Sequence, residues 1–398
     1  MAKKKVALVN VFFAPQAIGG ATRVLMDNVE VLREHYGDRF DLTAFTSDAE
    51  HWEESYRMDA YYYRGIPVYR VGLKFQKGMD WTPSDERMGR LFGRFLEREK
   101  PDLVHFHCIQ RLTASIVEEC ERRGIPFVVT LHDAWWISDY QFLVDRKGKV
   151  HPMGHPDGGG YTPPAGISMQ SSQRRISYLK ERLSKAAKLF SVSESFARIY
   201  RANGVENIVV TKNGISSKIP WRPKETGETP RVVCGHIGGM SEHKGFPFLR
   251  EAAVAGGLKN VEFLVVDHSK ESGYEAHESW GGSPVRVIGR IPQEEIVDLY
   301  SKIDVLFAPS IWPESFGLVT REAAACGCWV VAGNLGGIGE DVEEGVTGFV
   351  IEPSTRSVRE VLERIDADPA RYKAPAPVKK IRYVDEQVDE LVEWYEKL

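Results

Sequence analysis

The chain has 398 residues, which is enough for two domains of ordinary size. Hydrophobic residues make up 42% of it and charged residues 27%, a composition typical of a soluble globular protein, and the net charge of −4 gives no reason to expect a nucleic-acid partner. The five cysteines are scattered, and no apolar run approaches the roughly 18 residues of a membrane span. We therefore expect a cytoplasmic protein with reduced thiols.

The first half of the chain alternates apolar runs with helical patterns. We predict strands at 5–13, 40–46, 67–71, 102–107, 126–131 and 188–193. Helices are predicted at about 20–36, 84–99, 111–123 and 170–187. Such alternation is typical of a parallel sheet with helices on both faces, so we expect a first domain of this kind over residues 1–212.

The second half repeats the scheme after a break. Residues 213–230 are rich in Gly, Pro, Ser and charge, which is the composition of a linker. Strands are then predicted at 231–237, 261–266, 285–288, 304–308, 328–332 and 347–351, and helices at 245–255, 293–301, 317–326 and 355–366. We expect a second domain over residues 231–383, with the last helix (384–398) packing back on the first. Two doubly wound α/β domains facing across a cleft are the simplest architecture, with the ligand at the C-terminal strand ends.

Two segments differ from this pattern. Residues 132–166 are irregular and aromatic, and a long loop inside a compact domain is usually functional or disordered. Residues 172–190 form a basic amphipathic helix with six Lys or Arg against one Glu. Its polar side is either a simple solvated face or a surface for anionic lipid headgroups, which would give peripheral membrane contact.

The segment PSIWPESFGLVTREAAACG, residues 309–327, carries two acids eight positions apart. A buried strand precedes it, and a helix is expected to start at Phe316–Gly317. Seven helical residues rotate by about 700°, close to two full turns, so Glu322 should point to the side of the opening near Glu314. Acids beside a helix N-terminus suit a ligand that is partly anionic and partly hydroxylated, such as a sugar nucleotide. Two solvated helix charges are the alternative.

Two glycine-containing loops each follow a strand and precede a helix. Gly19 and Gly20 would let the backbone approach a phosphate or sugar closely, although a structural turn is the alternative. Lys244, in HIGGMSEHKGF, could pair with a diphosphate, although a surface lysine is the alternative.

Histidines end two of the predicted strands. His107 ends DLVHFH, and His132 with Asp133 follows PFVVTL, so both should lie at the ligand edge of the first sheet. Structural histidines are the alternative. His151 and His155 lack a nearby set of Cys or carboxylate ligands, and no D-x-D pair sits at a strand end. We therefore expect chemistry that needs neither metal nor cofactor.

Taken together, these residues resemble the family 4 retaining glycosyltransferases of the GT-B fold, of the bacterial polysaccharide or glycoconjugate type. The resemblance covers nearly the whole chain. Glu314 and Glu322 are similar to the family's E-x7-E motif, and Lys244 with Gly245 to its K-G element. Further similar segments are Asn213-Gly214, GRIPQEEIVDLYSKIDVLFAPS, NLGGIGEDVEEGVTGFVIEP, PDLVHFH and GIPFVVTLHD.

The resemblance implies a role for individual residues. Lys244 would bind the nucleotide diphosphate, Glu322 the ribose, and Glu314 the donor sugar. The other implied contacts are backbone N–H groups of Phe316, Gly317 and Leu318, a base contact from Ile291, and approach of the diphosphate and reacting sugar by Gly19, Gly20 and His107. The family's retaining reaction needs no metal and is drawn as a front-face displacement.

One departure from the family pattern concerns the diphosphate. Many members carry an arginine five residues before the lysine, and this chain has Gly239 there. His243, next to Lys244, is a candidate replacement. The segment VVDHS, residues 265–269, also replaces a turn that is commonly rich in glycine.

We therefore predict a retaining glycosyltransferase that moves a sugar from a nucleotide-diphosphate donor to a hydroxyl acceptor, with His107 and Glu314 at the reacting centre. The acceptor, a glycan or lipid-linked glycan, is expected on the first domain. There it would meet His132, Asp133 and the aromatic rings of Trp135, Trp136 and Tyr140. Two alternatives are a GT-B isomerase of sugar nucleotides and a catalytically silent protein that binds them.

Overall fold

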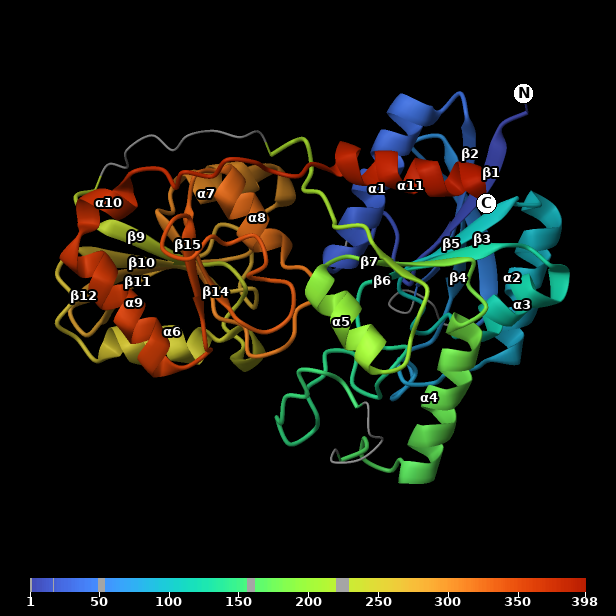
Figure 1. Ribbon diagram of the computed structural model, residues 1–398, viewed down its shortest axis with the longest axis horizontal. Coiled ribbons are helices and arrows are strands. Elements are labelled where there is room, and N and C mark those ends of the chain that lie inside the picture. The colour runs from blue at the N-terminus through green and yellow to red at the C-terminus, as the bar shows by residue number, and fades with distance from the viewer. Residues whose placement is uncertain (1, 17, 49–53, 156–161, 220–228) are drawn as a thin grey trace. The chain divides into compact units, whose positions relative to one another are not determined.

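The computed structural model describes residues 2–16, 18–48, 54–155, 162–219 and 229–398, and Figure 1 shows its elements. The chain divides into two compact units. Unit 1 comprises residues 1–216 and 383–398, and unit 2 comprises residues 217–382. Half of the expected linker, residues 220–228, lies outside the described residues. Among the residues described, no helix combines the length and the apolar character that crossing a membrane requires.

Unit 1 is built on one eight-stranded sheet with the order β3-β4-β2-β1-β5-β6-β7-β8. Its strands are β1 Lys4–Val9, β2 Phe40–Asp48, β3 Arg57–Tyr63, β4 Ile66–Gly72, β5 Leu103–Phe106, β6 Phe127–Leu131, β7 Lys188–Ser191 and β8 Ile208–Val210. All pairs are parallel except β3 with β4. Strands such as β6 are buried throughout and mostly apolar because helices cover both faces of a parallel sheet.

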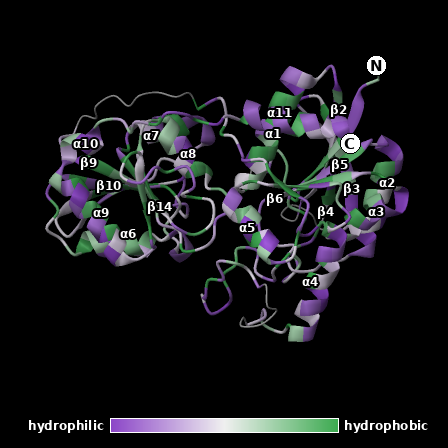
Figure 2. Ribbon diagram, viewed as in Figure 1, coloured by the Kyte–Doolittle hydropathy of each residue, from purple (hydrophilic) through white to green (hydrophobic). Residues whose placement is uncertain are grey.

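The helices of unit 1 are α1 Gly20–Tyr36, α2 Glu86–Glu99, α3 Ser115–Arg123, α4 Met169–Leu183, α5 Glu194–Ala202 and α11 Val384–Lys397. Side-chain caps fix several of their starts. The Asp85 carboxylate accepts from two backbone N–H groups at the start of α2, and the Ser193 hydroxyl accepts from one in α5. In Figure 2 helices such as α3 and α9 alternate hydrophilic with hydrophobic residues, as helices lying on a sheet must.

Helix α11 belongs to unit 1 although unit 2 precedes it in the chain. It packs beside α1, and its apolar residues at helical spacing, including Val388, Leu391 and Tyr395, are buried in the core of that unit. Gln387 accepts a hydrogen bond from the Gly214 N–H at 2.9 Å. Gly214 has to be a glycine, because a Cβ there would lie 2.2 Å from the Tyr383 carbonyl.

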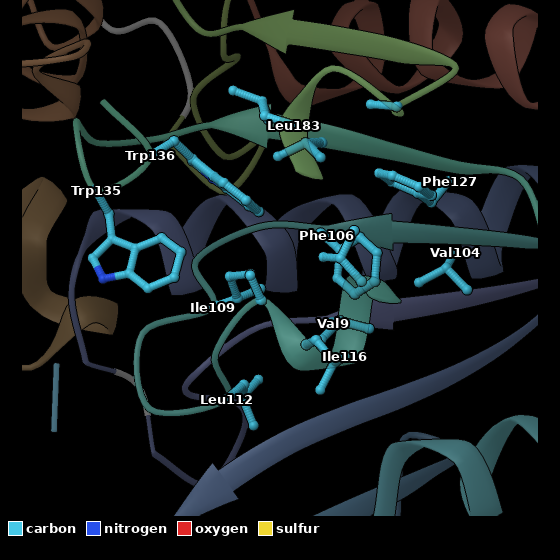
Figure 3. Close-up of a cluster of buried hydrophobic side chains, with 14 of the residues drawn as sticks. Val9, Val104, Phe106, Ile109, Leu112, Ile116, Phe127, Trp135, Trp136 and Leu183 are labelled. Carbon is cyan, nitrogen blue, oxygen red and sulfur yellow. The ribbon is translucent and has the colours of Figure 1, made fainter. Parts of the chain in front are cut away.

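The core of unit 1 continues into the loop after β6. Figure 3 shows Trp135 and Trp136 among side chains from β1, β5, α3 and α4. They are 2% and 3% exposed, and the Trp135 indole N–H donates to the Asp80 carbonyl at 2.6 Å. Both rings are packed into the core of unit 1, and their contact with an acceptor stays a prediction.

Several basic side chains of helix α4 bind partners within unit 1. The buried Arg175 guanidinium donates to the carbonyls of Trp81 and Ser138. Lys180 donates to a backbone carbonyl of α5's C-terminal end, and Arg182 pairs with Glu121 at 3.0 Å. These contacts favour a structural role for the basic residues, and membrane contact stays a prediction.

Unit 2 contains a seven-stranded sheet with the order β11-β12-β10-β9-β13-β14-β15. Its strands are β9 Val232–His236, β10 Val261–Val266, β11 Glu275–Trp280, β12 Ser283–Ile288, β13 Val305–Ala308, β14 Trp329–Gly333 and β15 Gly348–Ile351, and β11 alone runs antiparallel to its neighbour among these. The helices are α6 Phe246–Val254, α7 Ile296–Ser301, α8 Leu318–Ala325, α9 Thr355–Ala367 and α10 Pro369–Lys373. Single 3-10 turns occupy Glu242–Lys244 and Gln293–Glu295.

Each sheet has one point at which the strand order reverses direction. In unit 1 the chain leaves β1 toward β2 on one side and later adds β5 on the other. In unit 2 the corresponding strands are β9, β10 and β13. Loops that follow the two central strands diverge there, and open α/β sheets bind ligands at that point. Both sheets therefore confirm the prediction of two doubly wound α/β domains.

Candidate active site

Lys244 and Glu314 meet at the reversal point of the unit 2 sheet. Lys244 ends the 3-10 turn that follows β9, and Glu314 lies in the loop that follows β13. The Lys244 ammonium donates to Glu314 Oε1 at 2.9 Å and lies 4.6 Å from the centre of the Trp312 ring. Two residues 70 positions apart are thus brought together because β9 and β13 are neighbouring parallel strands.

The environment of Glu314 keeps its carboxylate charged. Burial alone would raise its pKa, but the Lys244 charge and a hydrogen bond from the Ser310 hydroxyl outweigh burial, so the pKa lies below its ordinary value. A carboxylate held in this way accepts hydrogen bonds and is poorly placed to act as a nucleophile. Its geometry suits a contact with hydroxyl groups.

Gly245 explains why a glycine follows this lysine. Its φ is 74°, in the left-handed region, and a Cβ there would lie only 2.0 Å from the Pro309 carbonyl oxygen. The loop after β13 therefore crosses directly over the loop after β9. A side chain at this position would push Lys244 and Glu314 apart.

Helix α8 begins at Leu318, slightly later than the predicted start at Phe316–Gly317. Gly317 has a φ of 88°, and a Cβ there would lie 2.6 Å from the Ile338 side chain, so the tight turn requires glycine. Phe316 is buried, and the first-turn N–H groups at Gly317 and Leu318 face the end of the helix. This is the arrangement that the anion-binding prediction requires.

Glu322 has a different partner from Glu314. It is 1% exposed, and its Oε2 accepts a hydrogen bond from the Tyr300 hydroxyl at 2.9 Å. The Glu322 side chain is therefore buried, and it contacts α7 through Tyr300. Its ribose contact stays a prediction.

Arg321 is a residue of this region that sequence reasoning missed. Its buried guanidinium donates to the carbonyls of Phe316 and Gly337, and at 2.8 Å it pairs with Asp341. It also lies 4.1 Å from the centre of the Phe316 ring. Arg321 thus ties the α8 start to the loop after β14. A cation inside an otherwise small and apolar helical turn was the available signal.

The two residues proposed for the base and for the missing arginine lie on the same sheet edge. Ile291 is half-buried in the loop after β12. Gly289 precedes it in the same loop, and a Cβ built on Gly289 would lie 1.8 Å from the Glu271 carbonyl oxygen. His243 packs against the edge of Trp312, with ring centres 5.1 Å apart. Burial and the nearby Lys244 charge lower the pKa of His243, so its imidazole is a neutral group beside the lysine.

In unit 1, Asn10 brings together the two loops expected to contact the donor. Its side-chain N–H group donates to Thr22 Oγ1 at 3.1 Å in the first turn of α1, and its oxygen accepts from the Cys108 N–H at 2.9 Å after β5. Gly19, with a φ of 82°, precedes α1, and Gly20 opens it. The glycine pair and His107 therefore lie at the reversal point between β1 and β5. Sequence reasoning did not single out Asn10.

Three histidines form a stacked row at this edge. His105 and His107 have ring centres 4.2 Å apart, and His107 Nδ1 lies 2.9 Å from His132 Nε2. Burial lowers the pKa of His105 and of His132 to about 3, and burial with the neighbouring histidines holds the pKa of His107 well below its ordinary value. The row is therefore neutral at physiological pH. His107 Nε2 is buried and lacks a hydrogen-bond partner among the described residues.

This row predicts an acid-sensitive unit 1. Because the folded-state pKa of His132 is about 3 and its ordinary value is 6.5, between these values the unfolded chain binds a proton that the folded chain does not. The free energy of unfolding should therefore fall as the pH falls, by about 1.4 kcal/mol per pH unit for each such histidine. The free energy of unfolding of wild type and of His132→Asn should be measured by urea unfolding at several pH values between pH 6.5 and pH 5. In the variant this free energy should change with pH less steeply, by about that amount per pH unit. Equal slopes would contradict a neutral buried His132.

Asp133 organises the loop after β6. Its carboxylate accepts hydrogen bonds from Gln110 at 2.7 Å and Gln141 at 2.8 Å, and its carbonyl accepts from the Tyr200 hydroxyl at 2.5 Å. Burial raises its pKa despite these donors. Asp133 therefore holds the loop in place, and an acceptor contact by His132 or Asp133 stays a prediction.

The other histidine pair does not form a metal centre with its surroundings. His151 Nε2 lies 3.1 Å from Asp145 Oδ2, and the His151 and His155 rings are 4.4 Å apart. Within the residues that the structure describes, no group of three or more His, Cys, Asp or Glu side chains could hold a metal ion.

Comparison with known proteins agrees with this arrangement. A family model described as "Glycosyl transferase 4-like domain" matches residues 19–214, and one described as "Glycosyl transferases group 1" matches residues 218–375. The D-inositol 3-phosphate glycosyltransferase of Rhodococcus opacus is 39% identical over 98 residues, 24% of this chain and only 22% of that relative. The alpha-maltose-1-phosphate synthase of Mycolicibacterium smegmatis is 26% identical over 291 residues, 66% of this chain and 69% of that protein.

Solved structures show the same fold. The sucrose-phosphate synthase of Thermosynechococcus elongatus superposes with a TM-score of 0.72 at 17% identity, covering 99% of each chain. Anabaena HepE in complex with UDP and glucose gives a TM-score of 0.67 at 18% identity, covering 99% of this chain and 100% of that one. With both family models matched in chain order over two doubly wound units, the chain belongs to the family 4 glycosyltransferases and has their two-domain GT-B fold.

Proposed function

We propose that this glycosyltransferase moves a sugar from a nucleotide-diphosphate donor to a hydroxyl group of a glycan or lipid-linked glycan, with retention of the anomeric configuration. The observation that carries the proposal is the Lys244–Glu314 pair at the reversal point of unit 2. It sets a fixed positive charge beside a hydroxyl-binding carboxylate, and a nucleotide sugar has a diphosphate beside a sugar ring. HepE has been solved in complex with UDP and glucose and with UDP-glucose, which supports a donor of this class.

The proposed reaction needs stabilisation of the departing diphosphate. Lys244 and the first-turn N–H groups of α8 would offset its developing charge, and such electrostatic contributions are usually the largest in group transfer. Glu314 would hold the donor sugar hydroxyls and Glu322 the ribose. A catalytic role for His107, a neutral imidazole whose Nε2 lacks a hydrogen-bond partner among the described residues, remains part of this proposal. With Lys244 supplying charge, we propose that no metal is required.

A two-stage experiment tests this function. In a thermal-shift screen of UDP, GDP, ADP and their sugar conjugates, the nucleotides of one base should raise the melting temperature of the protein. A ligand at 100 times its Kd stabilises the folded state by about 2.7 kcal/mol. The matching radiolabelled donor should then transfer its sugar to oligosaccharide or lipid-linked acceptors with EDTA present. The configuration of the product is read by NMR.

Each other result has a definite meaning. Binding of a donor without transfer to any acceptor would support a silent nucleotide-sugar binding protein. Conversion of the donor without an acceptor would support an isomerase. Inversion of configuration, or loss of transfer in EDTA that Mg²⁺ restores, would overturn the corresponding part of the proposal. No stabilisation by any nucleotide would reject the donor class itself.

A further inference from the structure

The loop that follows β9 is flanked by two basic side chains from different directions in the sequence. A Cβ built on Gly238 would lie 3.4 Å from the Lys244 side chain. A Cβ built on Gly239 would lie 3.3 Å from Nδ1 of His268. Because neither glycine has a side chain, the lysine stem and the imidazole both approach the loop backbone closely.

The position of this loop backbone is fixed. His236, the last residue of β9, places its Nε2 at 2.9 Å from the Gly239 carbonyl and its Nδ1 at 2.9 Å from the Phe307 carbonyl. Gly239 has a φ of 83°, which residues with a side chain rarely adopt. A residue with a side chain at this position would therefore be strained, and its Cβ would meet the His268 ring.

A built turn carries His268. It follows β10, and the Asp267 carboxylate accepts a hydrogen bond from the Ser269 N–H at 2.9 Å while the Asp267 carbonyl accepts from the Lys270 N–H at 3.1 Å. The Asp267 N–H itself donates to the Ile288 carbonyl of β12 at 2.8 Å. The turn thus fixes the backbone at both ends and leaves the His268 side chain exposed at the C-terminal edge of the sheet.

The strand order places this imidazole between two expected donor contacts. Along the edge, the loop after β12 carries Ile291, the loop after β10 carries His268, the loop after β9 carries Lys244, and the loop after β13 carries Glu314. Neighbouring strands are about 4.8 Å apart, so successive loops meet successive parts of an extended ligand. A nucleotide sugar laid along this edge with its base at Ile291 and its sugar at Glu314 would pass His268 before Lys244.

We propose that His268 is a further donor-binding residue, which donates a hydrogen bond from its imidazole to the phosphate nearer the nucleoside, while Lys244 binds the phosphate nearer the sugar. This inference rests on the function proposed above. It assigns the second diphosphate contact to a residue after β10. His243, the residue adjacent to Lys244, instead packs on Trp312.

Calorimetric titration with UDP, UMP and uridine, or the corresponding GDP or ADP series if the screen selects another base, tests the assignment. His268→Ala should weaken binding of the diphosphate and of the monophosphate about tenfold, since a hydrogen bond to a charged group is worth at least a factor of about ten. The affinity for uridine, which has no phosphate, should change less than twofold. His268→Gln keeps a donor and should bind UDP within about threefold of wild type. His277→Ala, an exposed histidine of β11 in the same unit, is the matched control and should bind as wild type.

The outcomes separate this inference from the function on which it rests. If wild type binds no nucleoside diphosphate, the proposed function fails. If Lys244→Ala weakens UDP binding but His268→Ala does not, the function stands and the assignment of His268 is overturned. Equal weakening of UDP and uridine would mean a contact with the base or ribose, which also overturns the phosphate contact. Because His268 is exposed, unchanged melting temperatures should show that its variants fold.

Discussion

Replacement of Lys244 by alanine should lower kcat/KM for sugar transfer by about 100- to 1000-fold. The variant removes a charged hydrogen bond to the diphosphate, worth about 1.5–3 kcal/mol, and it also leaves the Glu314 carboxylate without its cation. The pKa of Glu314 should then rise, because the Lys244 charge is the main influence that lowers it against burial. Steady-state kinetics with the selected donor measures the effect, and turnover within twofold of wild type would contradict the diphosphate role.

A double variant separates chemistry from stability. Lys244→Ala with Glu314→Gln removes both charges, so the stability lost in the single lysine variant should largely return while transfer stays low. Lys302→Ala, which removes an exposed lysine at the end of α7, is the matched control and should retain wild-type kinetics. Recovery of transfer in the double variant would mean that Lys244 acts only by stabilising the fold.

Replacement of Arg321 by alanine should destabilise unit 2 by about 3–5 kcal/mol, because each buried carbonyl that loses its donor costs about 1–3 kcal/mol. The variant leaves the Phe316 and Gly337 carbonyls without the guanidinium, whereas the half-exposed Asp341 can be solvated by water. For a unit of this size the melting temperature should fall by about 6–15 °C. Differential scanning calorimetry should show the loss in the transition that nucleoside diphosphate stabilises.

An exposed arginine in the same unit provides the comparison for this prediction. Arg356 has an 89% exposed side chain and pairs with Glu360 one helical turn away at 3.0 Å. Arg356→Ala should change the free energy of unfolding by less than about 0.5 kcal/mol, because surface pairs contribute little. Similar losses in both variants would show that burial of Arg321 does not matter to stability.

Most of the parallel strands were predicted well, and the two antiparallel edge strands were missed. Strands such as β6 and β13 are short runs of buried residues on both faces, which a pattern of apolar residues detects. Strand β3 and strand β11 are antiparallel edge strands with exposed and polar residues, and their sequences resemble loops. The three-residue β8 and the helix α5 were also missed. Strand β8 is too short to show a pattern, whereas the amphipathic pattern of α5 after its Ser193 cap was an available signal.

The candidate site was predicted in part for the same physical reason. His107 follows a strand directly, and Gly19, Lys244 and Glu314 lie in loops that follow strands, so the rule that ligands bind at strand ends selects all four as candidates. Asn10 and Arg321 act through partners on other loops, and no local pattern marks such partners. Trp135 was expected at the acceptor because of its loop, whereas its ring completes the core of unit 1.

The amino-acid pattern is sufficient to predict most of the elements, the two doubly wound domains and the family motifs, because strand and helix patterns and glycines at tight turns are local properties. Which side chains from separate loops meet depends on the tertiary structure. Lys244 pairs with Glu314, Glu322 accepts a hydrogen bond from Tyr300, and His268 lies close to Gly239. Each pair joins segments that are separate in the sequence. These pairings depend on the order of strands in the sheet, which is set by packing of the whole unit and is not written in any single segment.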